Sequence, residues 1–146
     1  MTEQSSRPIS ILLVEDVPDH LELLRLTLEN AGAAVTSTWD GEHAWALLTA
    51  ITPGSTPPDL LITDLRLPGL NGLELIRRVR SAPGLGALPV IAITAEHGTL
   101  LERALADGAS AALLKPVQAE ALLDLIRHVL QGRGNSLSEG LLSRID

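Results

Sequence analysis

Short runs of apolar residues alternate along this chain with longer segments whose apolar residues recur every three or four positions. Residues 9–14 (ISILLV) form a continuous apolar run, which is typical of a strand that is covered on both faces. A similar run, VIAIT at residues 90–94, follows a proline. Three further runs complete a set of five predicted strands: a weaker one at residues 35–38 and two more at residues 60–63 and 111–114.

A segment with helical spacing follows every predicted strand. The positions that mark one face of each predicted helix are Leu21, Leu24, Leu28 and Ala31; Ala44, Leu47 and Leu48; Leu75, Ile76 and Val79; Leu101, Ala104 and Leu105; and Leu122, Leu125, Ile126 and Val129. Because a strand, a crossover helix and the next strand require parallel pairing, the pattern predicts a doubly wound α/β fold with helices on both faces of a five-stranded parallel sheet.

Residues that favour helix ends agree with this division. Gly32, Gly108 and Gly132 each follow a segment with helical spacing, where a left-handed backbone conformation is common. Asp40 and Asn71 precede such segments and are predicted N-caps.

The length of 146 residues favours one domain, and the hydrophobic content of 45% is enough for a sizeable core. We expect a mobile N-terminal tail at residues 1–8, the domain at residues 9–131 and a C-terminal tail at residues 132–146. The apolar residues of that tail share one face of a predicted short helix, and residues 52–58 (TPGSTPP) predict a loop inside the domain.

Composition excludes several classes of function. The net charge of −7 argues against direct binding to nucleic acid or to an anionic membrane, and without Phe or Tyr there is no stacking platform for bases. No apolar run approaches the roughly 18 residues that a membrane span needs, and residues 1–6 lack the apolar region of a secretory signal. Since the chain has no cysteine, thiolate metal sites are excluded, and we expect a cytoplasmic protein.

Reactive side chains stand at the ends of four predicted strands. Glu15 and Asp16 follow the first strand, Asp64 follows the third, Thr94 ends the fourth and Lys115 follows the fifth. Ligands of parallel α/β sheets bind outside the carboxyl ends of the strands, so we expect these groups to converge. Lys115 is the only lysine of the chain, which indicates a need for a compact ammonium at this place.

Three converging carboxylates repel one another and require a cation or a proton. Oxygen ligands without histidine or cysteine favour Mg²⁺, Mn²⁺ or Ca²⁺. With the Lys115 ammonium and the Thr94 hydroxyl, they supply the groups that stabilise a phosphoryl group on an aspartate. The simpler alternative is a surface acidic cluster with an incidental ion pair to Lys115.

These residues, in this order and at these spacings, resemble the receiver domain of bacterial response regulators, the fold of the chemotaxis regulator. The resemblance extends over most of the chain and is carried by LLVED at residues 12–16, DLRLPG at 64–69 with NG at 71–72, ITA at 93–95, ADGA at 106–109 and KP at 115–116. It implies a flavodoxin-like (βα)5 fold with strand order 2-1-3-4-5.

The resemblance also implies how the acidic residues act. Asp64 resembles the aspartate that accepts a phosphoryl group from a phosphohistidine on a sensor histidine kinase or phosphotransfer protein. Asp16, Asp64 and the backbone carbonyl of Arg66 would bind Mg²⁺, and Glu15 would bind the ion through a water molecule.

Thr94 and Lys115 are implied contacts of the phosphoryl oxygens, and the Lys115–Pro116 peptide bond is expected to be cis. One position departs from the family. Receivers usually carry Tyr or Phe three residues before the lysine, where this chain has Ala112. In the family, the hydroxyl moves toward the phosphoryl group and the aromatic ring swings inward behind it. This chain therefore retains the hydroxyl, on Thr94, but lacks the ring.

The first functional hypothesis is a signalling domain, not an enzyme, that is phosphorylated on Asp64 and then changes its affinity for a downstream protein or for a second copy of itself. The alternative is a Mg²⁺-dependent phosphohydrolase that acts through an aspartyl phosphate. Such enzymes usually need an aspartate as general acid two residues after the nucleophile, where this chain has Arg66. A receiver-like scaffold that is never phosphorylated is disfavoured, because the site residues are all retained.

Two expectations concern the surroundings of the site. Arg66 and Glu96 each lie two residues after a site residue, and their opposite charges are expected to pair across the mouth of the site. The four histidines share no spacing and are expected to be solvated surface residues: His20, His43, His97 and His128.

Overall fold

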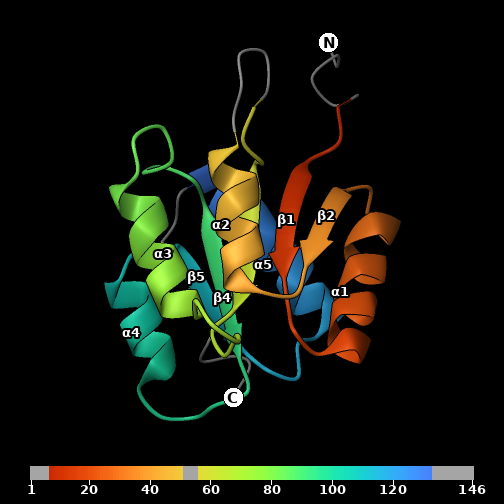
Figure 1. The fold of residues 1–146 in the computed structure, drawn as a ribbon. Helices are drawn as coiled ribbons and strands as arrows, with labels where there is room; N and C mark the ends of the chain where they lie inside the picture. Colours follow the sequence, from red (N-terminus) through yellow and green to blue (C-terminus); the bar gives the residue numbers. More distant parts are fainter. Residues whose placement is uncertain (1–6, 51–55, 133–146) are drawn as a thin grey trace.

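Five parallel strands form the centre of the molecule, in the order β2-β1-β3-β4-β5 (Figure 1). The computed structural model describes residues 7–50 and 56–132. Its strands are β1 (Ser10–Val14), β2 (Ala34–Thr38), β3 (Leu60–Asp64), β4 (Val90–Thr94) and β5 (Ala111–Leu114). The expected strand order is confirmed, and it makes β1 and β3 neighbours, so that the residues at their carboxyl ends meet.

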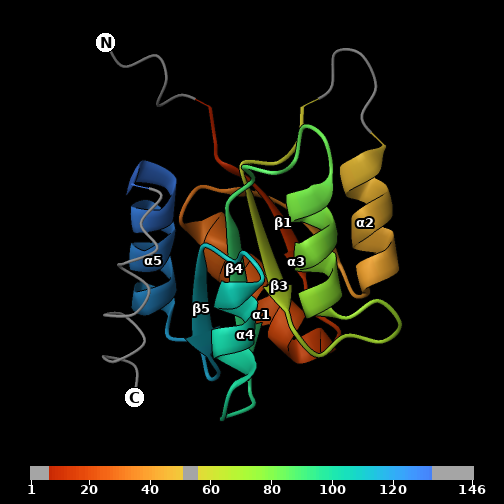
Figure 2. The ribbon, with the colours of Figure 1, turned by 90° about the vertical axis from the view of Figure 1, so that its left-hand side faces the viewer.

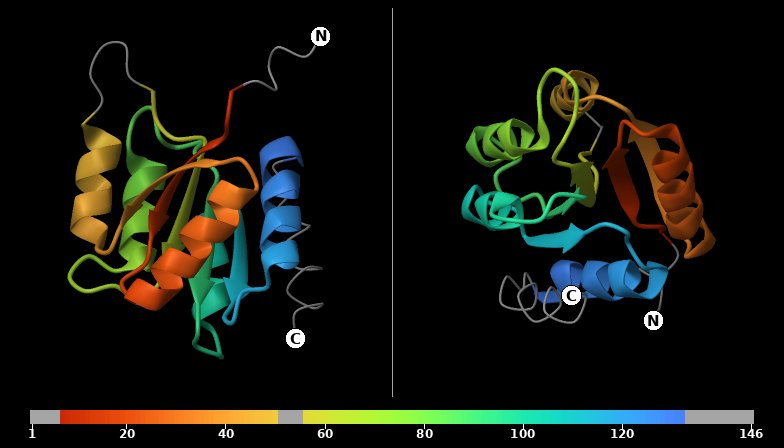
Figure 3. Two further views of the ribbon diagram at one scale, coloured as in Figure 1. Left: turned by 90° about the vertical axis from the view of Figure 1, so that its right-hand side faces the viewer. Right: turned by 90° about the horizontal axis from the view of Figure 1, so that it is seen from below.

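Helices cover both faces of the sheet (Figure 2). Side chains alternate between these faces along each strand. Leu12 and Val14 of β1 pack under α2, α3 and α4, whereas Ile11 and Leu13 pack under α1 and α5. The view from below shows the same division (Figure 3, right). The helices are α1 (Pro18–Asn30), α2 (Gly41–Thr49), α3 (Gly72–Ser81), α4 (Leu100–Ala106) and α5 (Ala119–Gly132).

The helix ends follow the predicted signals with one exception. The side chains of Asp40 and Asn71 each accept a hydrogen bond from the backbone amide three residues later, at 2.6 and 3.0 Å. Gly32 and Gly108 follow α1 and α4 with φ angles of 101° and 119°, a region that favours glycine. Gly132 is the last residue of α5 instead of the residue after it, so this predicted end was wrong by one position.

The expected tails lie almost wholly outside the described residues, and their boundaries stay predictions. Arg7, the first described residue, lies beside Asp59, with a guanidinium nitrogen 3.4 Å from a carboxylate oxygen. Among residues 7–50 and 56–132, no helix combines the length and the apolar character that crossing a membrane requires.

Candidate functional site

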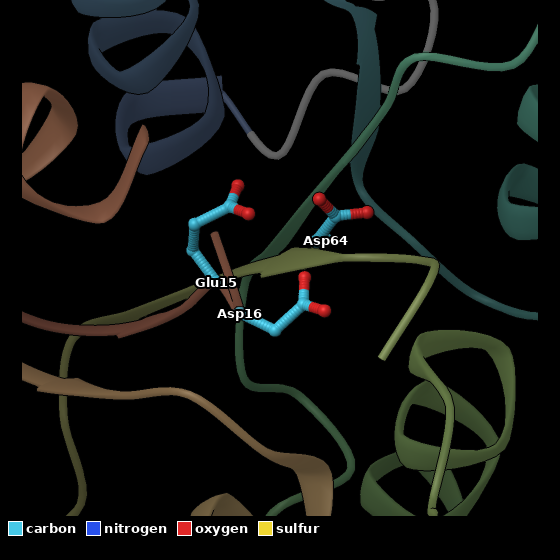
Figure 4. A group of neighbouring side chains, drawn as sticks. All are labelled: Glu15, Asp16 and Asp64. Atoms are coloured by element: carbon cyan, nitrogen blue, oxygen red, sulfur yellow. The ribbon is translucent and has the colours of Figure 1, made fainter. Parts of the chain in front are cut away.

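Three carboxylates meet where β1 and β3 end (Figure 4). Val14 pairs with Thr63 in the sheet, so Glu15, which follows β1, lies next to Asp64, the last residue of β3. Each of the three, Glu15, Asp16 and Asp64, offers an oxygen within 4.8 Å of the others. Glu15 is fully buried and Asp64 is 4% exposed. The predicted convergence of the acidic residues is therefore found.

Lys115 follows the edge strand β5 and reaches the same place. Its backbone amide donates to the carbonyl of Thr94 at 2.8 Å, and the following bond to Pro116 is cis, as expected. Its ammonium nitrogen Nζ lies 2.7 Å from Oδ2 of Asp64 and 2.8 Å from Oε1 of Glu15. One compact cation thus lies between two buried carboxylates, which agrees with the choice of lysine at this position.

Burial and charge act against each other in this cluster. Burial raises the pKa of Glu15, and hydrogen bonding from Lys115 and from the Val17 amide opposes this effect only in part. Burial alone would lower the pKa of Lys115, but the hydrogen bonds and charges of Asp64 and Glu15 outweigh it, so that this pKa is raised. The ammonium therefore stays charged and holds together two carboxylates that would otherwise repel each other.

One oxygen of Glu15 has capacity left for a further ligand. Oε2 accepts a hydrogen bond from the Val17 amide at 3.1 Å. Oε1 contacts Lys115 as an ion pair but, among the described residues, receives no hydrogen bond of proper geometry. A buried carboxylate oxygen in this condition, beside two further carboxylates, fits a hard divalent cation such as Mg²⁺.

The loop between β3 and α3, which begins after Asp64, is held near Asp64 at both of its ends. The Arg66 amide donates to Oδ1 of Asp64 at 2.9 Å, so the two carboxylate oxygens of Asp64 have different partners. Gly72 begins α3 where a side chain would overlap the carbonyl oxygen of Asp64. The sequence Asn71-Gly72 therefore provides a helix cap and the close approach of α3 to the end of β3.

Thr94 is fully buried at the end of β4, one position beyond the partner of Asp64 in the sheet. Its hydroxyl oxygen accepts a hydrogen bond from the Glu96 amide at 3.2 Å. The Glu96 carboxylate in turn pairs with the guanidinium of Arg66, and both side chains are exposed. The expected ion pair between Arg66 and Glu96 is thus found, and it joins the loops that follow β3 and β4.

The sequence analysis missed His20. Its side chain is 51% exposed, as expected for a surface histidine, but its Nδ1 atom lies 3.1 Å from Nζ of Lys115 and 3.9 Å from Oε2 of Glu15. His43 is likewise exposed, and its Nδ1 lies 2.8 Å from the hydroxyl of Thr38. The sequence did hold a signal: His20 lies in the first turn of α1, and helices that follow strands begin at the edge where the strands end.

A pocket of about 520 Å³ adjoins the site between α1 and α5. His20 and Lys115 form part of its wall, and most of its remaining surface is apolar, with Leu23, Leu24 and Leu122 among the lining residues. Leu23 is 65% exposed. An apolar surface therefore borders the acidic cluster on the side of Lys115.

Comparisons with known proteins agree with this geometry. The family model of the response regulator receiver domain matches residues 11–127. An uncharacterized 14.6 kDa protein from the sodA1 3′ region of Leptolyngbya boryana is 40% identical over 129 residues, which are 88% of this chain and 92% of that protein. The two-component response regulator ORR4 of Oryza sativa subsp. indica is 31% identical over 137 residues, and the match covers 83% of this chain but only 59% of ORR4.

Solved structures give the same result. The chemotaxis response regulator CheY4 of Vibrio cholerae superposes with a TM-score of 0.75 at 27% identity, and the match covers 84% of this chain and 99% of CheY4. Together with the family model, this agreement extends over the β1–α5 region that carries every residue of the acidic cluster.

Proposed function

This chain belongs to the response regulator receiver domain family, and we propose on that premise that Asp64 accepts a phosphoryl group from a phosphohistidine of a sensor histidine kinase or phosphotransfer protein. A carboxylate oxygen of Asp64 attacks phosphorus as the bond from phosphorus to the histidine nitrogen breaks. An acyl phosphate forms, and the imidazole leaves with the electron pair. The observation that supports this role is the 2.7 Å contact of Asp64 with Lys115 inside a cluster of three carboxylates.

The acidic residues would hold the metal ion of this reaction. We assign Glu15, Asp16, Asp64 and the backbone carbonyl of Arg66 to Mg²⁺, with Glu15 acting through water. When bound, Mg²⁺ neutralises the carboxylates and the charge that develops on the phosphoryl oxygens. The buried Oε1 of Glu15, which lacks a hydrogen bond among the described residues, supports this assignment.

Lys115 and Thr94 act on the transferred group. The Lys115 ammonium is already beside the oxygen of Asp64 that would carry phosphorus, and it would pair with a phosphoryl oxygen. The Thr94 hydroxyl would donate to another. That hydroxyl now accepts from the Glu96 amide, so its rotation toward the phosphoryl group would disturb residues 95–99, which lead into α4. Partner affinity would change through this loop.

The donor protein would approach across the apolar pocket between α1 and α5. The pocket adjoins Lys115, and the exposed side chain of Leu23 lies on its wall, so an apolar surface of the donor could be buried there beside Asp64.

The alternative of a phosphohydrolase lacks its general acid. Arg66 stands two residues after Asp64, and its guanidinium pairs with Glu96 at the mouth of the site. A guanidinium keeps its protons at neutral pH and cannot protonate a leaving group. We therefore retain the signalling function as the proposal.

The test is incubation with acetyl phosphate and Mg²⁺, followed by intact-mass measurement. We expect the wild type to gain one phosphoryl group, stable in acid and labile in base, and Asp64→Asn to gain none. An equal gain on Asp64→Asn would contradict the assignment. Sustained release of product from a phosphomonoester, measured in parallel, would instead favour the hydrolase.

A further inference from the structure

Three side-chain atoms, from separate parts of the chain, surround the ammonium of Lys115. Oδ2 of Asp64 lies at 2.7 Å, Oε1 of Glu15 at 2.8 Å and Nδ1 of His20 at 3.1 Å. A lysine ammonium has three protons to donate and accepts none. Asp64 and His20 make hydrogen-bond contacts with the ammonium, whereas Glu15 contacts it as an ion pair without proper hydrogen-bond geometry.

The contact is a hydrogen bond only for one form of the His20 ring. Because Lys115 can only donate, Nδ1 would have to accept, with the ring proton on Nε2. The side chain is 51% exposed, but its backbone belongs to α1, which is anchored on the sheet by the buried residues Leu24 and Leu28. The imidazole is thus presented from a packed helix.

We propose that His20 is a positioning residue that holds the Lys115 ammonium against Asp64, an inference that rests on the proposed phosphoryl acceptance. A lysine stem is flexible. One hydrogen bond to Asp64 and an ion pair with Glu15 leave the ammonium free to swing on its stem. A second hydrogen-bond acceptor, from α1, restricts this freedom and holds the ammonium where negative charge develops during transfer.

Kinetics with a small phosphodonor test this role without a kinase. Rates of phosphorylation by acetyl phosphate with Mg²⁺ are measured against donor concentration for wild type, His20→Leu and His20→Asn. Leucine removes the acceptor, whereas the asparagine oxygen can occupy the place of Nδ1. We expect His20→Leu to lower the maximal rate about three- to tenfold with little change in the half-saturating donor concentration, and His20→Asn to stay within about twofold of wild type.

The matched control is His128→Leu, because His128 is an exposed histidine on α5. It should phosphorylate at the wild-type rate. Melting temperatures of all variants separate positioning from folding. A His20→Leu rate equal to wild type, or equal slowing by leucine and asparagine, would overturn the inference.

A second readout uses the fact that the chain has one lysine. After labelling with [¹⁵N]lysine, the side-chain ammonium gives a single nitrogen signal that belongs to Lys115. We expect its protons to exchange with water more slowly in wild type and His20→Asn than in His20→Leu. Identical exchange in all three proteins would contradict the contact. Failure of the wild type to phosphorylate would count against the proposed function, whereas this exchange measurement still decides the contact.

Discussion

Thr94 borders two regions of opposite character. Toward β1 and β3 lie the buried charges of Glu15, Asp64 and Lys115. Beneath α4, on the same face of the sheet as Thr94, lie alanines: Ala92 and Ala112 face each other across β4 and β5, and both are fully buried. The first region is held together by particular charged groups, whereas the second is held together by close packing of small apolar side chains.

This difference separates the phosphorylation chemistry from its readout. With alanine at position 112, no ring can rotate behind Thr94, so the proposed change in partner affinity would be carried by residues 95–99 and α4. That segment is weakly held: α4 has seven residues, and among the described residues the side chain of its N-cap Thr99 makes no capping hydrogen bond. By contrast, α3 has ten residues and the Asn71 cap. The segment nearest to Thr94 is therefore the one that can move at low cost.

The largest effect should come from Asp16→Ala. We expect it to abolish phosphorylation by acetyl phosphate, because a metal ligand is lost, while the melting temperature stays equal or rises, because repulsion among the carboxylates is relieved. Asp19→Ala, three residues away in the first turn of α1, is the control and should phosphorylate normally. Wild-type rates for Asp16→Ala would disprove the metal assignment.

Lys115→Met should lower the free energy of unfolding at pH 7 by about 3–5 kcal/mol, since it leaves buried carboxylates without their cation. The folded-state pKa of Lys115 is raised, so its contribution is complete below the ordinary value of 10.5 and disappears as pH rises through the folded-state value. The difference between the two proteins in urea unfolding should therefore shrink at strongly alkaline pH.

The control for this variant is Arg25→Met, which breaks the exposed pairs with Glu22 and Glu29 and should cost about 0–1 kcal/mol. If Lys115→Met costs no more than Arg25→Met, the buried ion pair does not stabilise the site.

Ala112→Tyr examines the other region. A ring forced into the packed space beneath α4 should destabilise the protein by about 1–3 kcal/mol and alter amide hydrogen exchange in residues 95–106. The rate of phosphorylation should stay within about twofold of wild type. The reverse pattern, with slower chemistry and an unchanged melting temperature, would place position 112 in the site.

The smallest effect concerns the pair at the mouth of the site. Replacing both Arg66 and Glu96 by alanine should change stability by only about 0–1 kcal/mol, because both side chains are exposed. We expect the phosphoryl group to be lost faster, since water gains access to Asp64. Equal lifetimes of the acyl phosphate in the two proteins, followed by release of inorganic phosphate, would show that the pair does not shield the site.

The apolar runs predicted the strands and the residues at their carboxyl ends, because buried strands carry continuous apolar runs and α/β topology brings those ends together. The strand order was predicted from the resemblance to the receiver family. The position of His20 in the first turn of α1 indicates the correct edge of the sheet, but its contact with Lys115 could not be predicted, since that contact depends on how α1 is rotated on the sheet. The strand pattern also predicted that Glu15, Asp64 and Lys115 meet, but not which carboxylate oxygens lie nearest to the ammonium.

The central claim is that Asp64 carries the phosphoryl group, and reductive mapping tests it most directly. After reaction with acetyl phosphate and Mg²⁺, borohydride converts an aspartyl phosphate into homoserine, which peptide mass spectrometry locates. Our account predicts homoserine at position 64 alone, and none when Mg²⁺ is chelated. Homoserine at Asp16 or at any other position, or a phosphorylated protein with position 64 unmodified, would contradict it.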